Sequence, residues 1–115
     1  MSKFIDVEEN DLVLLLRLKD EDLGPEQAED FKEIVKNRTA KNIKGVVVNF
    51  SLVNYMSSIF LSALIEVLKD LKNRKIKFAL AELNEKILEV LKATRLDEVF
   101  SIFGSSYEAY SSFKK

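Results

Sequence analysis

The segment at residues 45–71, GVVVNFSLVNYMSSIFLSALIEVLKDL, constrains the fold of this chain more than any other part. Val46, Val47 and Val48 form an unbroken apolar run, which is typical of a strand that is covered on both faces of a sheet. A short polar loop follows, and leucine and isoleucine then recur with the spacing of an amphipathic helix. A doubly covered strand followed by such a helix predicts a layered α/β domain.

Strand and helix alternate along the rest of the chain as well. A short strand is expected at residues 3–7, a turn at 9–11, and a second strand at 12–19, where leucines 12, 14, 16 and 18 share one face. These two strands should form an antiparallel hairpin. Two more strands are expected, at residues 76–80 and 99–103.

Helix boundaries are marked by proline and by capping residues. Pro25 suits the first turn of one helix, Asn84 can cap another, and Ser105 with Glu108 forms a capping box for the last. The side chains expected to face the core are Ala28, Phe31, Ile34 and Val35; Leu61, Leu64, Ile65, Leu68 and Leu71; Ile87, Leu88 and Leu91; and Tyr107, Tyr110 or Phe113. We therefore expect one α/β domain over residues 1–115, with about five strands and four helices. The sheet should be mostly parallel, with one antiparallel edge strand.

The composition excludes several classes of function. The 115 residues include no cysteine and no histidine. A thiol nucleophile, an imidazole base near neutral pH and the usual zinc ligands are therefore missing. The net charge is −1 and both signs are mixed along the sequence, so no basic block predicts nucleic-acid binding. We expect a binding protein rather than an enzyme, with no catalytic residue, no metal and no cofactor.

The apolar runs are short. The longest, at residues 12–16 and 45–48, fall far below the roughly 20 residues of a transmembrane helix. The first ten residues, MSKFIDVEEN, lack the apolar core of a signal peptide. These features predict a cytoplasmic protein with no membrane partner.

A serine pair, Ser57 and Ser58, stands where the polar loop meets the helix that follows the central strand. Serine is a favoured N-cap, so capping by at least one of the two is the simpler interpretation. The free N–H groups and the dipole at a helix N-terminus also favour negative charge. The pair is therefore also a candidate phosphorylation site.

Four apolar residues bracket the serine pair. Tyr55 and Met56 precede it, and Ile59 and Phe60 follow it. Met56 and Ile59 are expected to belong to the core. Phe60 is harder to place there, because Leu61 follows it directly and already defines the inward stripe. We therefore expect Phe60 to contact a partner.

Three segments of the chain, taken in order, resemble the STAS domain, in particular the bacterial anti-sigma factor antagonists. They are DLVLLLRLKDEDLGPEQAEDFKEIV at 11–35, VVVNFSLVNYMSSIFLSALIEVLKDLKNRKIKFALAEL at 46–83 and ILEVLKATRLDEVFSIFGSSYEA at 87–109. The resemblance implies partner switching. The antagonist binds an anti-sigma factor that is also a serine kinase, phosphorylation of one loop serine ends the binding, and a phosphatase restores it.

The family's loop runs hydrophobic, hydrophobic, Asp, Ser, Ser or Ala, Gly, Leu. When this pattern is aligned with the chain, Ser58 falls on the phosphorylated position, whereas an alignment shifted by one residue would select Ser57. The chain departs from the pattern in three places, because Ser57 replaces the acid, Ile59 the small residue and Phe60 the glycine. Asn49 also stands where the central strand usually ends in aspartate. Phosphoregulation in this member therefore stays open.

The resemblance implies a partner-binding surface and two partners, an anti-sigma factor kinase and a phosphatase. The residues expected at the surface are Tyr55, Met56, Ser57, Ser58, Ile59 and Phe60. One alternative is a degenerate STAS scaffold or homodimerisation module that is never phosphorylated. A small hydrolase with a serine nucleophile is disfavoured, because the chain has no Gly-x-Ser-x-Gly elbow. A nucleotide or lipid pocket is disfavoured because there is no glycine-rich phosphate loop.

Overall fold

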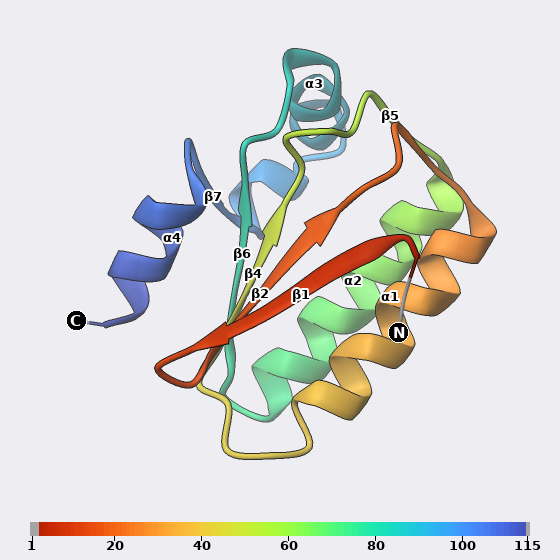
Figure 1. The fold of residues 1–115 in the computed structure, drawn as a ribbon. Helices are drawn as coiled ribbons and strands as arrows, with labels where there is room; N and C mark the ends of the chain where they lie inside the picture. The colour runs from red at the N-terminus through yellow and green to blue at the C-terminus, as the bar shows by residue number, and fades with distance from the viewer. Residues whose placement is uncertain (1–2, 115) are drawn as a thin grey trace.

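The computed structural model describes residues 3–114 and has the expected α/β architecture (Figure 1). In chain order its elements are β1 (Ile5–Asn10), β2 (Val13–Leu18), β3 (Asp22–Leu23), α1 (Pro25–Arg38), β4 (Gly45–Asn49), β5 (Tyr55–Met56), α2 (Ser58–Asn73), β6 (Lys77–Ala81), α3 (Glu85–Ala93), the short 3-10 helix η1 (Leu96–Glu98), β7 (Ser101–Phe103) and α4 (Ser106–Phe113). None of the helices in the described range has the length and apolar character that crossing a bilayer requires.

Five strands form the main sheet in the order β1-β2-β4-β6-β7. The β1–β2 pair is antiparallel and the other neighbours are parallel, which confirms the expected topology. Helices α1 and α2 cover one face of this sheet, and α4 packs on the other (Figure 1). Val46, Val47 and Val48 of the central strand β4 are almost completely buried between these layers, because their side chains alternate between the two cores.

The hairpin between β1 and β2 has a tighter turn than expected. Asn10 pairs with Val13, so only Asp11 and Leu12 form the turn, at φ values of 49° and 67°. Positive φ at both central residues is typical of a type I′ turn, whose twist matches that of the strands. The expected turn at residues 9–11 is therefore wrong. Leu12 does not join the apolar face of β2, and its side chain is 45% exposed.

A second, two-stranded sheet was not expected from the sequence. Strands β3 and β5 pair in parallel, with Asp22 opposite Tyr55 and Leu23 opposite Met56. Each strand has only two residues, which is too short for an alternating pattern to be recognised. The pairing places the acidic segment before α1 directly beside the loop that leads into α2.

Helix α2 is rotated by nearly one residue from the expected orientation. Its buried residues are Phe60, Ala63, Leu64, Val67 and Leu71, whereas Leu61, Ile65 and Leu68 are partly buried at the edge of the core. One residue corresponds to roughly 100° around a helix. The inward face is centred near Phe60, whose ring packs against Phe31 of α1 with 5.4 Å between centroids.

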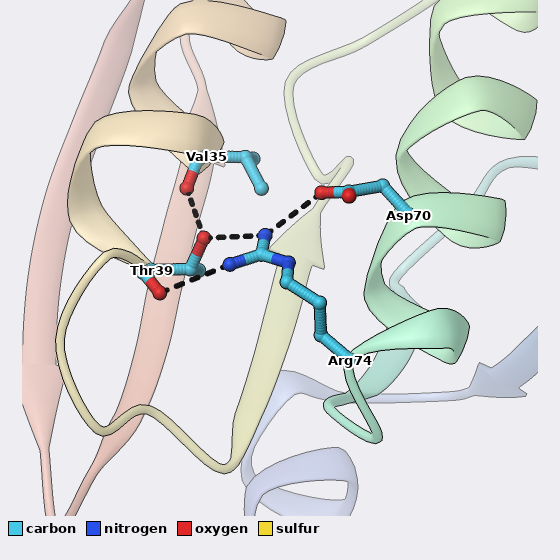
Figure 2. Close-up of polar contacts among 4 residues, drawn as sticks. All are labelled: Val35, Thr39, Asp70 and Arg74. Atoms are coloured by element: carbon cyan, nitrogen blue, oxygen red, sulfur yellow. Dashed lines mark hydrogen bonds and ion pairs between the residues drawn. The ribbon is translucent and has the colours of Figure 1, made fainter.

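An arginine joins the C-terminal ends of α1 and α2 (Figure 2). Arg74 donates through Nη1 to the carbonyl oxygen of Thr39 at 3.1 Å, and through Nη2 to the Thr39 hydroxyl and the Asp70 carboxylate, both at 2.8 Å. Thr39 is 2% exposed and donates its own hydroxyl proton to the carbonyl of Val35. The guanidinium thus lies where the two helix dipoles favour positive charge.

The last helix packs against the sheet through Ala109, Tyr110 and Phe113. Ser105 caps α4, as expected. Of the three aromatic residues considered for burial, only Phe113 is buried, whereas Tyr107 is 76% exposed. The Phe113 ring lies directly against Gly45, and a Cβ atom at that glycine would overlap the ring.

A polar cluster ties α4 to the hairpin turn. Tyr110 donates its phenolic hydrogen to Asp11 Oδ2 at 2.6 Å, and Lys114 Nζ lies 3.0 Å from the same oxygen. The Tyr110 hydrogen bond, followed by the contact with Lys114, lowers the pKa of Asp11 below its ordinary value. The same contacts with Asp11 raise the pKa of Tyr110 and of Lys114.

Candidate functional site

The two serines at the start of α2 have different environments. Ser57 is the N-cap: its Oγ accepts the N–H of Phe60 at 3.2 Å, and its own N–H donates to the carbonyl of Leu23 at 2.9 Å. The side chain is partly buried. Capping by one serine of the pair is thus confirmed, and the capping residue is Ser57.

Ser58 is the first residue of α2 and is exposed. Within residues 3–114 its hydroxyl makes no hydrogen bond. The first turn of α2 carries no acidic side chain, so its N-terminal N–H groups have no carboxylate of their own helix nearby. Ser58 therefore presents a free hydroxyl at the positive end of a helix dipole.

The expected roles of Ile59 and Phe60 are exchanged in the structure. Phe60 is completely buried and Ile59 is 52% exposed. Both expectations are wrong for one reason: the inward face of α2 is centred on Phe60, and Ile59 lies one residue outside it. Met56 is at the edge of the core with 9% exposure, as expected.

Three apolar side chains remain accessible at this junction. They are Leu52 at 44%, Tyr55 at 61% and Ile59 at 52% exposure. We call these three residues together with Ser58 the switch surface. Leu52 did not stand out in the sequence, because a single leucine in a polar loop is ordinary. The neighbouring Val53 is the buried apolar residue of this loop, and that leaves Leu52 on the outside.

Negative charge borders the switch surface on one side. Residues 45–65 carry no charged side chain. Across the β3–β5 pair, however, Asp22 lies opposite Tyr55, and Glu21 accepts a hydrogen bond from the side chain of Asn54 at 3.1 Å. The surface therefore combines apolar contacts with an acidic margin.

Asn49 lies apart from the serine pair. Its Nδ2 donates to Glu82 Oε2 at 2.9 Å and to Ser106 Oγ at 2.7 Å, and its Oδ1 accepts the N–H of Ser51 at 2.8 Å. Ser106 begins α4, which packs on the sheet face opposite α2. The residue at the position of the family's aspartate thus secures the last helix in this structure.

The described part of the chain, residues 3–114, has no cluster of three or more carboxylate, imidazole or thiol side chains that could hold a metal ion. Nor is there a basic side chain in the loop that contains the serine pair. The junction therefore presents three accessible apolar side chains and the exposed hydroxyl of Ser58.

Comparisons with known proteins support the resemblance drawn from the sequence. A family model described as the STAS domain matches residues 4–109. A candidate anti-sigma factor antagonist from Thermotoga maritima superposes with a TM-score of 0.86 at 26% identity, over 98% of this chain and 97% of that one. An anti-sigma factor antagonist from Mycobacterium paratuberculosis gives 0.84 at 17% identity, over 96% and 93%. The unphosphorylated antagonist SpoIIAA gives 0.82 at 13%, over 96% of both chains.

Proposed function

Since the chain belongs to the STAS domain family and has the fold of anti-sigma factor antagonists, we propose that it binds a kinase-type anti-sigma factor in the cytoplasm. Binding uses the switch surface and ends when Ser58 is phosphorylated, and a phosphatase restores it. The protein itself has no catalytic role. One observation carries this proposal: Ser57 caps the helix and leaves the Ser58 hydroxyl exposed and, among residues 3–114, without a hydrogen bond.

Ser58 is the better phosphate acceptor of the pair. A kinase must reach the hydroxyl and position it for transfer, which requires an exposed side chain without competing hydrogen bonds. Phosphorylation of Ser57 would modify the oxygen that accepts the N–H of Phe60, so the cap would have to form again with a phosphate oxygen. Loss of a serine cap costs about 1 kcal/mol of stability. Modification at Ser58 leaves the cap in place.

The charge surroundings explain how one phosphate could release a partner. A phosphoserine adds close to two negative charges. The loop and the first two turns of α2 contain no cation to pair with it, and Asp22 lies across the neighbouring strand pair. The new charge therefore acts on the bound partner. One uncompensated charge in an interface costs about 3–5 kcal/mol, which is at least a hundredfold loss of affinity.

The contact residues we propose are those that are accessible, with Leu52, Tyr55 and Ile59 around Ser58. Tyrosine is enriched among the few residues that dominate binding energy in protein interfaces, and neighbouring apolar contacts exclude water from them. Met56 and Phe60 belong to the core at this junction, with exposures of 9% and 0%. Phe60 has no accessible area with which to contact a partner.

The test is phosphorylation by the cognate anti-sigma factor kinase with ATP, followed by peptide mapping. We expect phosphate on Ser58, none on Ser58→Ala, and phosphate on Ser57→Ala at the wild-type position. Binding to the kinase in the absence of ATP should weaken for Ile59→Ala while the fold is unchanged. Equal labelling of wild type and Ser58→Ala would overturn the assignment.

A scaffold that is never phosphorylated is the second candidate. It is favoured by Asn49, whose amide is engaged with Glu82 and Ser106 and which stands where the family usually has an aspartate. Mass spectrometry of the protein from its native cell separates the two. Unmodified Ser58 in every growth state, with a stable dimer by light scattering, would favour the scaffold.

A further inference from the structure

Folding separates charges that are mixed along the sequence. Residues 38–44 and 72–77 connect the helices α1 and α2 to the strands β4 and β6 at the amino-terminal ends of those strands. Neither segment contains an acidic residue. Their exposed cations, which we call the basic end, are Arg38, Lys41, Lys44, Lys72, Arg74, Lys75 and Lys77.

The two segments form one continuous surface. The N–H of Lys77 donates to the carbonyl of Lys44 at 3.0 Å, and the N–H of Lys44 donates to the carbonyl of Leu12 at 2.9 Å. The hairpin turn therefore belongs to the same end of the molecule. Figure 1 shows these loops together at the lower end, opposite the end where α3 and β5 lie.

Helix dipoles account for only part of this charge. Arg38 and Lys72 occupy the last turns of α1 and α2, where cations are favoured. The dipole effect decays within one turn, so it reaches Lys75, which directly follows the C-cap Arg74, but it does not explain Lys44 or Lys77. Among residues 3–114 no carboxylate lies within ion-pair distance of these three ammonium groups.

Two acids at this end are already engaged. Asp70 pairs with Arg74 at 2.8 Å, and Asp11 with Lys114 at 3.0 Å. Unbalanced cations repel one another and lower stability. Lys44, Lys75 and Lys77, which have no ion pair within the described residues, therefore give this end the character of a binding surface for a polyanion.

Leu12 is a second, independent feature of the basic end. It sits at the tip of the hairpin with 45% of its side chain exposed and φ at 67°. A leucine at positive φ is rare, and glycine or asparagine would be favoured in such a turn. The strain presents an aliphatic side chain outward, beside Lys44.

We propose that the basic end docks on an anionic lipid bilayer, with lysine ammonium groups at the phosphates and Leu12 inserted among the headgroups. Basic residues at an anionic leaflet act together with an inserted apolar side chain in this way. A nucleic acid fits less well, because the cations lie at the ends of helices and strands and on the short loops between them, so no helix presents them along one face to enter a groove. The surface lies at the opposite end from Ser58, so the proposal does not depend on the proposed function.

The test is co-sedimentation of the full chain with vesicles. The wild-type protein should bind mixed phosphatidylglycerol–phosphatidylcholine vesicles and dissociate from them at high salt. It should not bind vesicles of pure phosphatidylcholine. Each basic residue near an anionic leaflet is worth roughly fivefold in affinity, so Lys44→Gln, Lys75→Gln and Lys77→Gln together should weaken binding by about 100-fold. A charge-matched control replaces Lys19, Lys86 and Lys92, which lie toward the other end, and should bind like the wild type.

A single substitution separates lipid contact from structure. Leu12→Gly creates an Asp-Gly turn that favours the observed conformation, so its thermal stability should equal or exceed that of the wild type. Its vesicle binding should nevertheless fall severalfold. Equal loss in both triple variants, unchanged binding by Leu12→Gly, or binding to duplex DNA without binding to vesicles would each overturn the proposal.

Discussion

Replacing Phe60 with alanine tests whether the residue after Ile59 belongs to the core. The side chain is fully buried and its ring packs on Phe31. Phenylalanine-to-alanine substitutions in cores cost about 3–5 kcal/mol. We expect a value near the upper limit, because an aromatic pair contributes a further ~1 kcal/mol beyond the buried area. For a domain of this size the thermal midpoint should fall by roughly 12–20 °C.

The assay is urea denaturation followed by far-ultraviolet circular dichroism, with Ile59→Ala as the matched control. Ile59 is half exposed, so its substitution should change the free energy of unfolding by less than about 0.5 kcal/mol. The effects of the two substitutions on partner binding should be in the opposite order to their effects on stability. Phe60→Ala should bind almost normally under conditions where it is folded, whereas Ile59→Ala should bind poorly. A stability loss below about 1 kcal/mol for Phe60→Ala would refute the burial argument.

Three further substitutions test the contacts that hold the fold together. Arg74→Lys should lower the free energy of unfolding by about 1–2 kcal/mol in urea titrations, since an ammonium group cannot replace the forked hydrogen bonds of the guanidinium. Gly45→Ala should displace the Phe113 ring and speed proteolysis of the C-terminal helix, and a smaller side chain at position 113 should reverse the effect. The folded state lowers the pKa of Asp11, so the stability that this group contributes is present above the ordinary carboxyl pKa and is lost as the pH falls through the lower folded-state value. Tyr110→Phe should therefore be less stable than the wild type at neutral pH by thermal melting, and the difference should shrink in acid.

The parts of the fold that follow local rules could be predicted from the sequence. The valine run at residues 46–48 marks a strand covered on both faces, because only such a strand can be apolar at every position. Asn84 and Ser105 mark helix starts, because their side chains accept the N–H groups that a helix leaves free. For the same reason a serine had to cap α2. The sequence left open which of the two it was.

The features that were missed depend on contacts between distant segments. The β3–β5 pair joins residues separated by the whole of α1 and β4, and its strands are too short to carry a pattern. The exchange of Ile59 and Phe60 has a similar origin. Ile59 and Phe60 are both apolar, and either could extend the apolar stripe of α2. The inward position is taken by Phe60, whose ring packs against Phe31 of α1. The margin of acids and the basic end appear only after the chain is folded.

The two ends of the molecule should respond independently to modification. Helix α2 runs from Ser58 to Asn73, and its 16 residues span roughly 24 Å. That is more than twice the Debye length of about 8 Å at physiological salt, so charge added at Ser58 is screened before it reaches Lys75. We therefore expect Ser58→Glu to lose binding to the anti-sigma factor while keeping wild-type affinity for anionic vesicles. The measurement is vesicle co-sedimentation and partner binding on one preparation, and a parallel loss of both would show that the ends are coupled through the fold.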